Sequence, residues 1–161
     1  MDEVLRMINV NFYNTRIGLF KIAEDGTGVT ELEIVDEKEK DDFEPSETPL
    51  LAKAAKQLEE YLSGKRMIFD FPLNPKGTEF QKKVWEVLKT IPYGETWSYK
   101  QVAVALGKPT ASRAVGMANN RNPIMIVVPC HRVVGSNGDL VGYAGGLDLK
   151  AMLLKLEKEH E

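Results

Sequence analysis

The feature that most constrains the fold is a change in hydrophobic pattern along the 161-residue chain, at residues 66–77. Before this stretch, short segments rich in β-branched and aromatic residues are separated by turn-forming residues, which predicts a small antiparallel sheet. After it, apolar residues recur at helical spacing. Pro72 and Pro75 lie within the stretch, so it predicts a linker between two domains, residues 1–75 and 76–161.

The first half predicts strands followed by one helix. Three segments read as strands: residues 8–13, 17–22 and 29–35. The mainly acidic stretch 36–44 predicts a solvated loop. Thr48 followed by Pro49 is typical of a helix N-cap and its first residue, and Gly64 is expected to end that helix.

The second half predicts mainly helices. Capping boxes, in which Thr or Ser is followed three residues later by Gln, begin at Thr78 and Ser98. A third helix is predicted from an N-cap at Thr110 to about Asn120. The second and third helices are joined by residues 107–109, an arrangement similar to a helix-turn-helix. Such a pair fits insertion into a DNA groove and ordinary packing in a helical core about equally.

The rest of the chain is expected to alternate between buried and loop segments. Residues 124–128 predict a buried extended run that Pro129 ends, and the glycine-rich stretch 135–146 predicts loops or a hairpin. Asp148 is expected to cap a final helix. The inward-facing residues of that helix are expected to be Leu149, Met152, Leu153 and Leu156. The fold class is therefore α+β, with a small antiparallel-sheet domain before a mainly helical one.

Charge is distributed unevenly between the two halves. The whole chain carries a net charge of -3, which by itself argues mildly against nucleic acid as a partner. Residues 1–75 carry a net charge of -7, whereas residues 76–161 carry +4. The second half is thus the part suited to a polyanion, although the excess alone is a weak signal.

The cysteine content excludes several classes of protein. Cys130 is the only cysteine, so no intramolecular disulfide forms, and the two histidines with it are too few for a structural zinc site. Residues 1–10 lack the apolar core of a secretory signal, and the apolar runs are too short to span a bilayer. We therefore expect no metal, no membrane association and a cytoplasmic location, or a nuclear one in a eukaryotic source.

The motif that carries chemistry is Pro-Cys-His-Arg-Val-Val at residues 129–134. A thiol is a strong nucleophile only as the thiolate, and a nearby imidazole can remove its proton. Adjacency in sequence does not itself bring Cys130 and His131 into contact. The proline, however, ends an apolar run and presents Cys130 where a pocket is expected.

This hexapeptide and its surroundings closely resemble the O6-alkylguanine-DNA alkyltransferases, which repair DNA by direct reversal. Further motifs occur in family order: Phe80-Gln81, Val84-Trp85, Ile91-Pro92-Tyr93-Gly94, Ser98-Tyr99, Ser112-Arg113-Ala114-Val115-Gly116, Asn119-Asn120-Arg121-Asn122-Pro123 and Gly142-Tyr143-Ala144-Gly145-Gly146-Leu147. The resemblance is dense over residues 76–158 and only topological over residues 1–75. It implies an N-terminal domain of ribonuclease H-like topology and a C-terminal winged helix-turn-helix domain.

The resemblance also implies catalytic roles. Cys130 would attack the alkyl carbon in one in-line displacement. His131 would take the thiol proton through a water, and Glu157 would orient the imidazole. Tyr99 would donate a proton toward N3 of the guanine, and Asn122 would fix the loop before the cysteine.

A base pocket and a DNA-binding helix are implied as well. The pocket would be formed by Tyr143, Ala144, Gly145 and the Val133 carbonyl, which would accept from the exocyclic amine. Many relatives have serine where this chain has Ala144, so a side-chain hydroxyl contact would be missing. The recognition helix would enter the minor groove of double-stranded DNA with little sequence specificity. Arg113 of that helix would fill the gap left by the flipped base. The DNA-facing residues would be Tyr99, Ser112, Arg113, Ala114 and Gly116.

The implied product is a stable thioether on the protein, so each molecule would act once, and no cofactor would be needed. The resemblance also implies a monomer in solution. It leaves both cooperative and independent binding along DNA open. Some relatives carry zinc in the N-terminal domain, but residues 1–75 contain neither Cys nor His. Two other readings remain beside this one: a cysteine hydrolase or acyl transferase that turns over, and a protein that binds alkyl lesions without chemistry.

Overall fold

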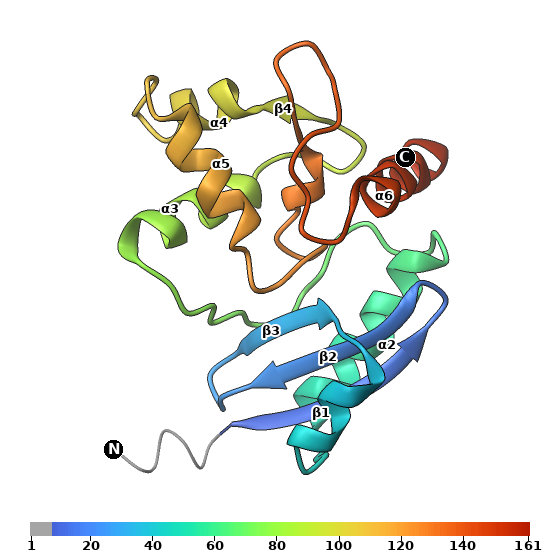
Figure 1. The fold of residues 1–161 in the computed structure, drawn as a ribbon. Helices are drawn as coiled ribbons and strands as arrows, with labels where there is room; N and C mark the ends of the chain where they lie inside the picture. The colour runs from blue at the N-terminus through green and yellow to red at the C-terminus, as the bar shows by residue number, and fades with distance from the viewer. Residues whose placement is uncertain (1–7) are drawn as a thin grey trace. The chain divides into compact units, whose positions relative to one another are not determined.

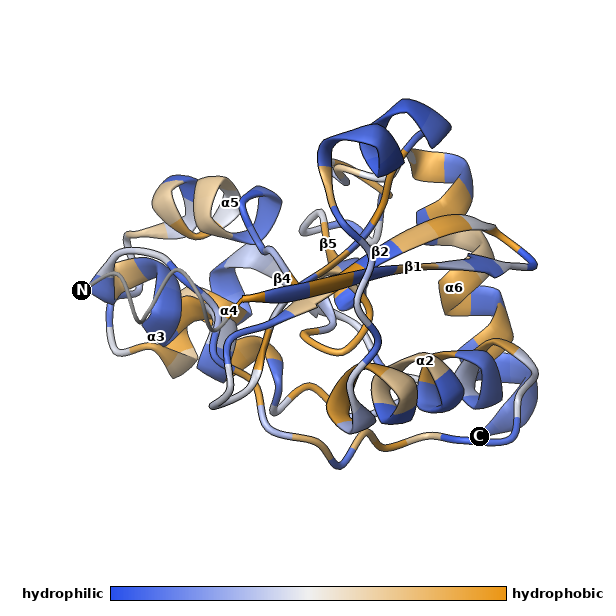
Figure 2. Ribbon diagram, turned by 90° about the horizontal axis from the view of Figure 1, so that it is seen from below, coloured by the Kyte–Doolittle hydropathy of each residue, from blue (hydrophilic) through white to orange (hydrophobic). Residues whose placement is uncertain are grey.

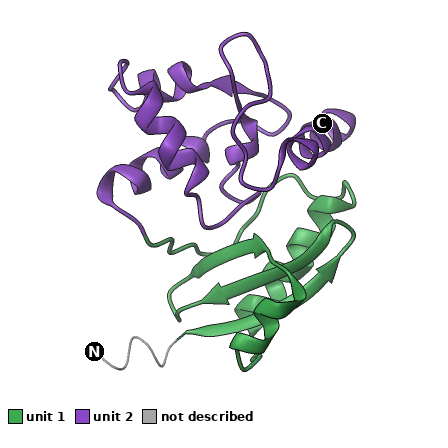
Figure 3. Ribbon diagram, viewed as in Figure 1, with its two compact units in different colours: residues 1–76 green, residues 77–161 purple. Residues whose placement is uncertain are grey.

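A computed structural model of the chain describes residues 8–161. They fall into two compact units, divided between Lys76 and Gly77, which are described separately below (Figure 3). The prediction that residues 1–10 are not a secretory signal concerns mostly residues 1–7, which lie outside the described residues. Among the described helices, none is long and apolar enough to cross a membrane.

Unit 1 is built on an antiparallel three-stranded sheet with the strands in sequence order: β1 (Asn9–Thr15), β2 (Gly18–Glu24) and β3 (Val29–Ile34). All three predicted strands are present, with ends shifted by at most two residues. Helix α2 (Pro49–Leu62) packs on β1 and β2 (Figure 1). As predicted, Thr48 caps this helix, its hydroxyl accepting from the Leu51 amide at 3.2 Å. Apolar and polar residues alternate around α2 in Figure 2, as expected for a helix with one buried face.

Two expectations for unit 1 are wrong. The acidic stretch predicted as a loop contains a 3-10 helix, η1 (Glu37–Asp42), because Asp36 acts as its N-cap and accepts from the Glu39 amide. The predicted linker is also partly ordered into unit 1. Val29 pairs with Leu73, and Phe71 is buried. The two units divide one residue after the predicted boundary, but most of the predicted linker belongs to unit 1.

Unit 2 is mainly helical. Its helices are α3 (Glu79–Leu88), α4 (Tyr99–Ala105), α5 (Ser112–Asn120) and α6 (Leu147–His160), and the short 3-10 helix η2 spans Cys130–Arg132. Strands β4 (Trp97–Ser98) and β5 (Val133–Val134) pair in parallel. Both predicted capping boxes, at Thr78 and Ser98, are present. The predicted α+β class is confirmed.

Helix α5 packs against both α3 and α4, so α4 and α5 form the predicted helix pair (Figure 1). One face of α5 lies in the core, with Val115 and Ala118 buried. The indole nitrogen of Trp85 in α3 donates to the Ala118 carbonyl at 2.9 Å. The opposite face of α5 is exposed and includes Met117, which is 65% exposed. The packing interpretation therefore holds for the buried face of α5, whereas insertion of its exposed face into a DNA groove stays a prediction.

Two predicted N-caps are wrong. Helix α5 begins after Ala111 with no side-chain cap, because a turn that bonds the Ala111 amide to the Lys108 carbonyl leads into it from Thr110. Helix α6 begins after Gly146, whose φ of 97° lies in the left-handed region that favours glycine. Asp148 lies in the first turn instead, where a carboxylate still stabilises the helix N-terminus.

Three further segments differ from or refine the expectation. Residues 124–128 are mostly buried but form consecutive turns and not an extended run. The stretch 135–146 is a loop. On α6, Met152 is 37% exposed, and Leu149 and Leu156 are half-buried. The buried stripe of that helix consists of Lys150, Leu153 and Glu157.

Candidate active site

Cys130 begins the η2 turn, immediately before strand β5, and its side chain is only 5% exposed. The Asn122 amide nitrogen donates to the Cys130 sulfur at 3.2 Å and to the Val128 carbonyl at 2.8 Å. The Asn122 carbonyl oxygen accepts from the Ile124 amide at 3.0 Å. One asparagine therefore fixes both ends of the loop that leads to the thiol and contacts the thiol itself. The structure brings together these two predicted residues.

The loop between Asn122 and Cys130 is strained at Ile126. Its φ is 73°, and it is the one non-glycine residue with positive φ among residues 8–161. A β-branched side chain rarely adopts this conformation, which costs on the order of 1–3 kcal/mol. The Ile126 side chain is buried, so packing compensates for the strain. The packing of Ile126 therefore fixes the backbone conformation of the loop that leads to the thiol.

The Cys130 thiol is protonated at neutral pH in this environment. Burial raises its pKa to about 11, against the opposing effects of the Asn122 hydrogen bond and the Lys150 charge. The free protein therefore holds a thiol, and the nucleophilic thiolate forms only when a base takes the proton.

His131, the next residue of the same turn, is fully buried with Glu157 of α6. Its Nε2 lies 2.6 Å from Glu157 Oε2. Burial alone would raise the pKa of Glu157, but hydrogen bonds and charges from His131 and Arg132 hold it at about 2. The carboxylate is thus ionised and accepts hydrogen bonds, among them one from the Gly94 amide at 3.0 Å. Sequence analysis paired His131 with Glu157, and their side chains do meet.

The histidine is a neutral base. Burial lowers the pKa of His131, and although Glu157 raises it, the charges of Arg132 and Lys150 lower it further. Because an ionised carboxylate only accepts, we assign the proton to Nε2, which leaves the lone pair on Nδ1. A thiol, a neutral imidazole and a carboxylate in this order can supply a nucleophile, its base and an orienting group.

Arg132 is a member of this cluster that the sequence analysis did not single out. Its Nε donates to Glu157 Oε1 at 2.9 Å, and Nη2 donates to Oε2 at 3.0 Å. Its Nη1 donates to the Ile91 carbonyl at 2.7 Å. This two-point contact fixes the plane of the Glu157 carboxylate. The signal available in the sequence was the arginine within the motif at residues 129–134, a residue type that is rarely buried unless paired.

Two predicted tyrosines lie near enough to Cys130 for its charge to act on them. The Tyr99 hydroxyl donates to the Val141 carbonyl at 3.2 Å. The pKa values of Tyr99 and Tyr143 are both raised, first by burial and then by the charge that Cys130 acquires on deprotonation. Both hydroxyls therefore stay protonated at neutral pH and can donate a proton or a hydrogen bond.

The remaining pocket residues lie in the loop before α6 and in β5. Ala144 and Gly145 are exposed, whereas Val133 is buried. A Cβ on Gly145 would lie 2.8 Å from Leu149 and 3.1 Å from the Tyr143 ring, so only glycine fits there without rearrangement. The Val133 carbonyl accepts from the Lys150 ammonium, a contact that the sequence analysis did not anticipate.

The predicted recognition residues lie on α5, away from the acceptor turn in sequence. Arg113 and Ala114 are exposed, and Ser112 and Gly116 are half-buried. A Cβ on Gly116 would lie 3.6 Å from the Tyr99 ring, so the small residue brings this helix next to that side chain. Helix α5 therefore carries exposed residues, Arg113 and Ala114, and also contacts Tyr99 of the candidate site through Gly116.

Comparison with known proteins places this geometry in a family. Residues 79–159 match the family described as 6-O-methylguanine DNA methyltransferase, DNA binding domain. Residues 8–75 match the one described as 6-O-methylguanine DNA methyltransferase, ribonuclease-like domain. The chain belongs to the 6-O-methylguanine DNA methyltransferase family. The resemblance inferred from the sequence motifs is confirmed.

Curated relatives of this methyltransferase family match over nearly the whole chain. A methylated-DNA–protein-cysteine methyltransferase of Methanosarcina acetivorans is 50% identical over 148 residues, which is 90% of this chain and 95% of the relative. The constitutive methylated-DNA–protein-cysteine methyltransferase of Bacillus subtilis is 48% identical over 159 residues, 92% of this chain and 96% of the relative.

Solved structures of the methyltransferase family also match over nearly the whole chain. The crystal structure of the Mycobacterium tuberculosis O6-methylguanine methyltransferase has a TM-score of 0.85 and 42% identity, over 96% of this chain and 95% of that one. A crystal structure of the mycobacterial protein in complex with DNA has a TM-score of 0.86 and 42% identity, over 94% of each chain.

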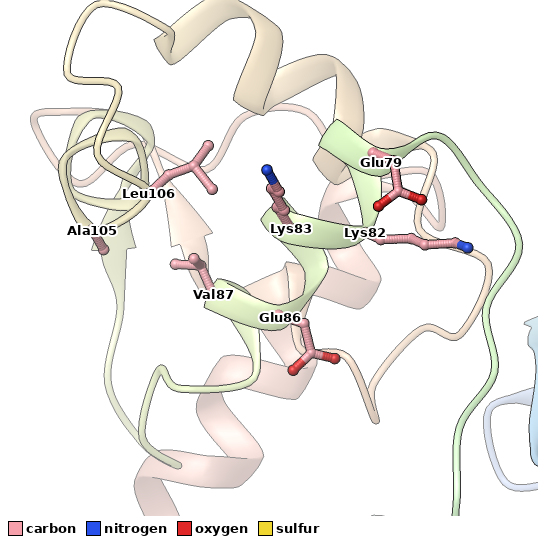
Figure 4. A pocket seen from close by; sticks show the side chains of 7 residues that line it. All are labelled: Glu79, Lys82, Lys83, Glu86, Val87, Ala105 and Leu106. Atoms are coloured by element: carbon pink, nitrogen blue, oxygen red, sulfur yellow. The ribbon is translucent and has the colours of Figure 1, made fainter.

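A surface hollow elsewhere in unit 2 is not part of this site. It measures about 380 Å³ and lies between α3 and α4 (Figure 4). Its lining residues are Glu79, Lys82, Lys83, Glu86, Val87, Ala105 and Leu106. None of them belongs to the motifs that carry the methyltransferase resemblance, and Cys130 is absent from this lining.

Proposed function

We propose that this methyltransferase-family chain repairs O6-alkylguanine in DNA by transferring the alkyl group to its own Cys130. The observation that carries the proposal is the buried Cys130 thiol, which Asn122 contacts and which shares its turn with His131, the partner of Glu157 from α6. The names of the relatives, which are methylated-DNA–protein-cysteine methyltransferases, support the same reaction.

The reaction begins with the proton of Cys130, which passes through a water to Nδ1 of His131. Glu157 stabilises the imidazolium that forms. The thiolate then attacks the alkyl carbon in line, a carbon–sulfur bond forms, and the carbon–oxygen bond breaks. The electron pair of that bond goes to the guanine, which Tyr99 neutralises by protonating N3.

The flipped base binds between the Tyr143 loop and strand β5. The Val133 carbonyl accepts from the exocyclic amine with its second lone pair, the first being used by Lys150. Ala144 and Gly145 supply backbone groups and space, since neither has a side chain that reaches the base. The alkyl carbon is thereby held in front of the Cys130 sulfur, which is the positioning that a direct displacement needs.

DNA binds to unit 2 through α5, which enters the minor groove of the duplex with little sequence specificity. Arg113 occupies the space of the flipped base, and Ser112, Ala114 and Gly116 allow close approach of the helix to the DNA backbone. The basic charge of residues 76–161 supports binding that weakens as salt rises. The protein acts as a monomer in this proposal.

Each molecule acts once, because a thioether has no leaving group that the site residues activate. The number of alkyl groups removed is then limited by the number of protein molecules with a reduced Cys130. This supports a reducing compartment, the cytoplasm, as the place of action, since oxidation would consume Cys130 without repair.

The test is to incubate the protein with a duplex containing O6-methylguanine and to weigh the peptide that carries Cys130. We expect a gain of one methyl group that saturates at one per protein. Cys130→Ala should bind the same duplex without any mass gain. Repeated turnover would contradict the proposal in favour of a hydrolase or acyl transferase, and binding without mass gain in the unaltered protein would favour a lesion-binding protein.

A further inference from the structure

Asn119 of α5 is a buried polar residue beside the turn that carries the thiol. It lies on the buried face of the helix with Val115 and Ala118, and it is only 1% exposed. Its amide nitrogen donates to the Cys130 carbonyl at 3.4 Å. Its amide oxygen, Oδ1, has no hydrogen-bond partner among residues 8–161. Buried polar atoms are nearly always hydrogen-bonded, so this acceptor beside the nucleophile calls for a physical reason.

The orientation of the Asn119 amide group follows from its partner. A carbonyl oxygen only accepts hydrogen bonds, so the NH₂ group of the amide, and not Oδ1, must face the Cys130 carbonyl. The Val133 amide donates to the same carbonyl and uses its second lone pair. Oδ1 therefore faces away from this carbonyl, but it belongs to the same small planar group, next to the peptide bond that joins Cys130 to His131.

A second asparagine brings the sulfur to the same end of α5. Asn122 lies three residues after Asn119, and its backbone amide donates to the Asn119 carbonyl, so both side chains come from one continuous turn. The Asn122 amide nitrogen contacts the Cys130 sulfur at 3.2 Å. The end of α5 therefore contacts both the backbone and the sulfur of Cys130, through one asparagine each.

The water that carries the thiol proton in the proposed reaction has one hydrogen bond still to make. It accepts from the Cys130 thiol and donates one proton to Nδ1 of His131, so its second proton needs an acceptor. Buried waters typically make about three hydrogen bonds to protein groups. Asn119 Oδ1 is a buried acceptor of this kind, and its amide contacts the peptide that joins the thiol residue to the imidazole residue.

We propose that Asn119 is a positioning residue for alkyl transfer: its Oδ1 accepts from the water that relays the Cys130 proton to His131 and thereby orients that water. In the relay, the S–H bond breaks and its electron pair stays on the sulfur. The proton joins the water oxygen while another proton of the same water passes to Nδ1. This inference rests on the proposed function, because it assigns Asn119 a part in that reaction.

A high-resolution crystal structure of the unaltered protein tests the contact. We expect an ordered water within about 3.2 Å of both Asn119 Oδ1 and His131 Nδ1. This measurement needs neither DNA nor a variant. A structure with no water on Oδ1, or with one that does not reach His131, overturns the inference.

Asn119→Leu separates positioning from folding, because leucine has a similar size and no polar side-chain atoms. Donor and acceptor are lost together, and the Cys130 carbonyl keeps the Val133 amide, so the thermal midpoint should stay within about 3 °C of the unaltered protein. In single-turnover transfer from the O6-methylguanine duplex, the limiting rate should fall about 10- to 100-fold at an unchanged half-saturating DNA concentration. The control is Asn14→Leu, which changes an exposed asparagine of unit 1 and should match the unaltered protein.

A limiting rate of Asn119→Leu within about threefold of the unaltered protein overturns the inference, and so does a loss confined to the half-saturating DNA concentration. If the variant does not fold, or has a much lower thermal midpoint, the water in the unaltered protein decides. Failure of the proposed function looks different: the unaltered protein would then gain no methyl group from DNA, while the crystallographic water would still report on Asn119.

Discussion

Replacing Glu157 with Gln should destabilise unit 2 by about 3 kcal/mol, because it removes the charge from a buried ion pair. The substitution keeps the shape of the side chain but leaves the buried Arg132 guanidinium without a counter-charge, which costs on the order of 3–5 kcal/mol. The pKa of Glu157 falls from its ordinary 4.5 to about 2 on folding, which by linkage corresponds to about 3 kcal/mol at neutral pH.

The pH dependence has a definite sign. A carboxyl group whose pKa is depressed by folding contributes its full stabilisation above its unfolded pKa and loses it as the pH falls through the folded one. For Glu157 this window runs from 4.5 down to about 2. Because protonated glutamate and glutamine are nearly the same shape, the unaltered protein and Glu157→Gln should differ at pH 7 and converge near the lower end of the window.

Unit 2 can be followed selectively, because both tryptophans of the chain, Trp85 and Trp97, lie within it. Urea unfolding monitored by tryptophan fluorescence should be repeated at several pH values for Glu157→Gln and for Glu159→Gln. Glu159 is exposed on the same helix, so its variant should stay within about 0.5 kcal/mol of the unaltered protein. Thermal midpoints should fall by roughly 4–8 °C for each kcal/mol lost.

The same variant should transfer methyl groups at least about 100-fold more slowly, since His131 loses the charge that stabilises its protonated form. Two results would refute the reasoning. One is a stability equal to that of the unaltered protein at pH 7. The other is a stability difference that stays constant from pH 7 to pH 2, which would show that the loss has another origin than the Glu157 charge.

Three further perturbations test other parts of unit 2. Asn122→Ala removes three hydrogen bonds and should cost about 2–3 kcal/mol in urea unfolding, while slowing iodoacetamide alkylation of Cys130; unchanged alkylation would contradict the assigned contact with the sulfur. Arg113→Ala should slow transfer from duplex DNA much more than transfer from the free O6-alkylguanine base, and an equal loss on both would remove Arg113 from the proposed flipping role. Trp85→Phe removes the indole donor from the Ala118 carbonyl, which keeps the Arg121 amide as its other donor, and should cost about 0.5–1.5 kcal/mol by calorimetry; no measurable loss would mean that the indole hydrogen bond contributes little.

Local signals predicted much of the scaffold. The capping boxes at Thr78 and Ser98 depend on residues three apart, and the structure contains both. The strands and α2 followed from hydrophobic period and turn residues. Thr110 and Asp148 misled for a shared reason: each is a good capping residue beside a helix whose start is set by the preceding backbone, a turn in one case and Gly146 in the other.

The site was predictable where it is local or carried by a motif, and less so where it depends on tertiary packing. Cys130 and His131 are adjacent, but their link to Glu157 needs α6 to return to the turn. Lys150 escaped notice because a lysine on a helix is normally solvated. One signal was available: Lys150 and Glu157 flank Leu153 at helical spacing, so two charged residues share the buried stripe of α6.

The strain at Ile126 has a consequence for how this family chain tolerates sequence change. Substitution by glycine would remove the backbone strain but also the buried side chain that keeps the loop in place. Substitution by another bulky residue would keep the strain and disturb the packing. Both smaller and larger residues are therefore expected to be unfavourable at position 126, although Ile126 contacts neither DNA nor the alkyl group in the proposed reaction. A hydrophobic residue with no chemistry of its own therefore limits which substitutions the loop before the nucleophile can accept.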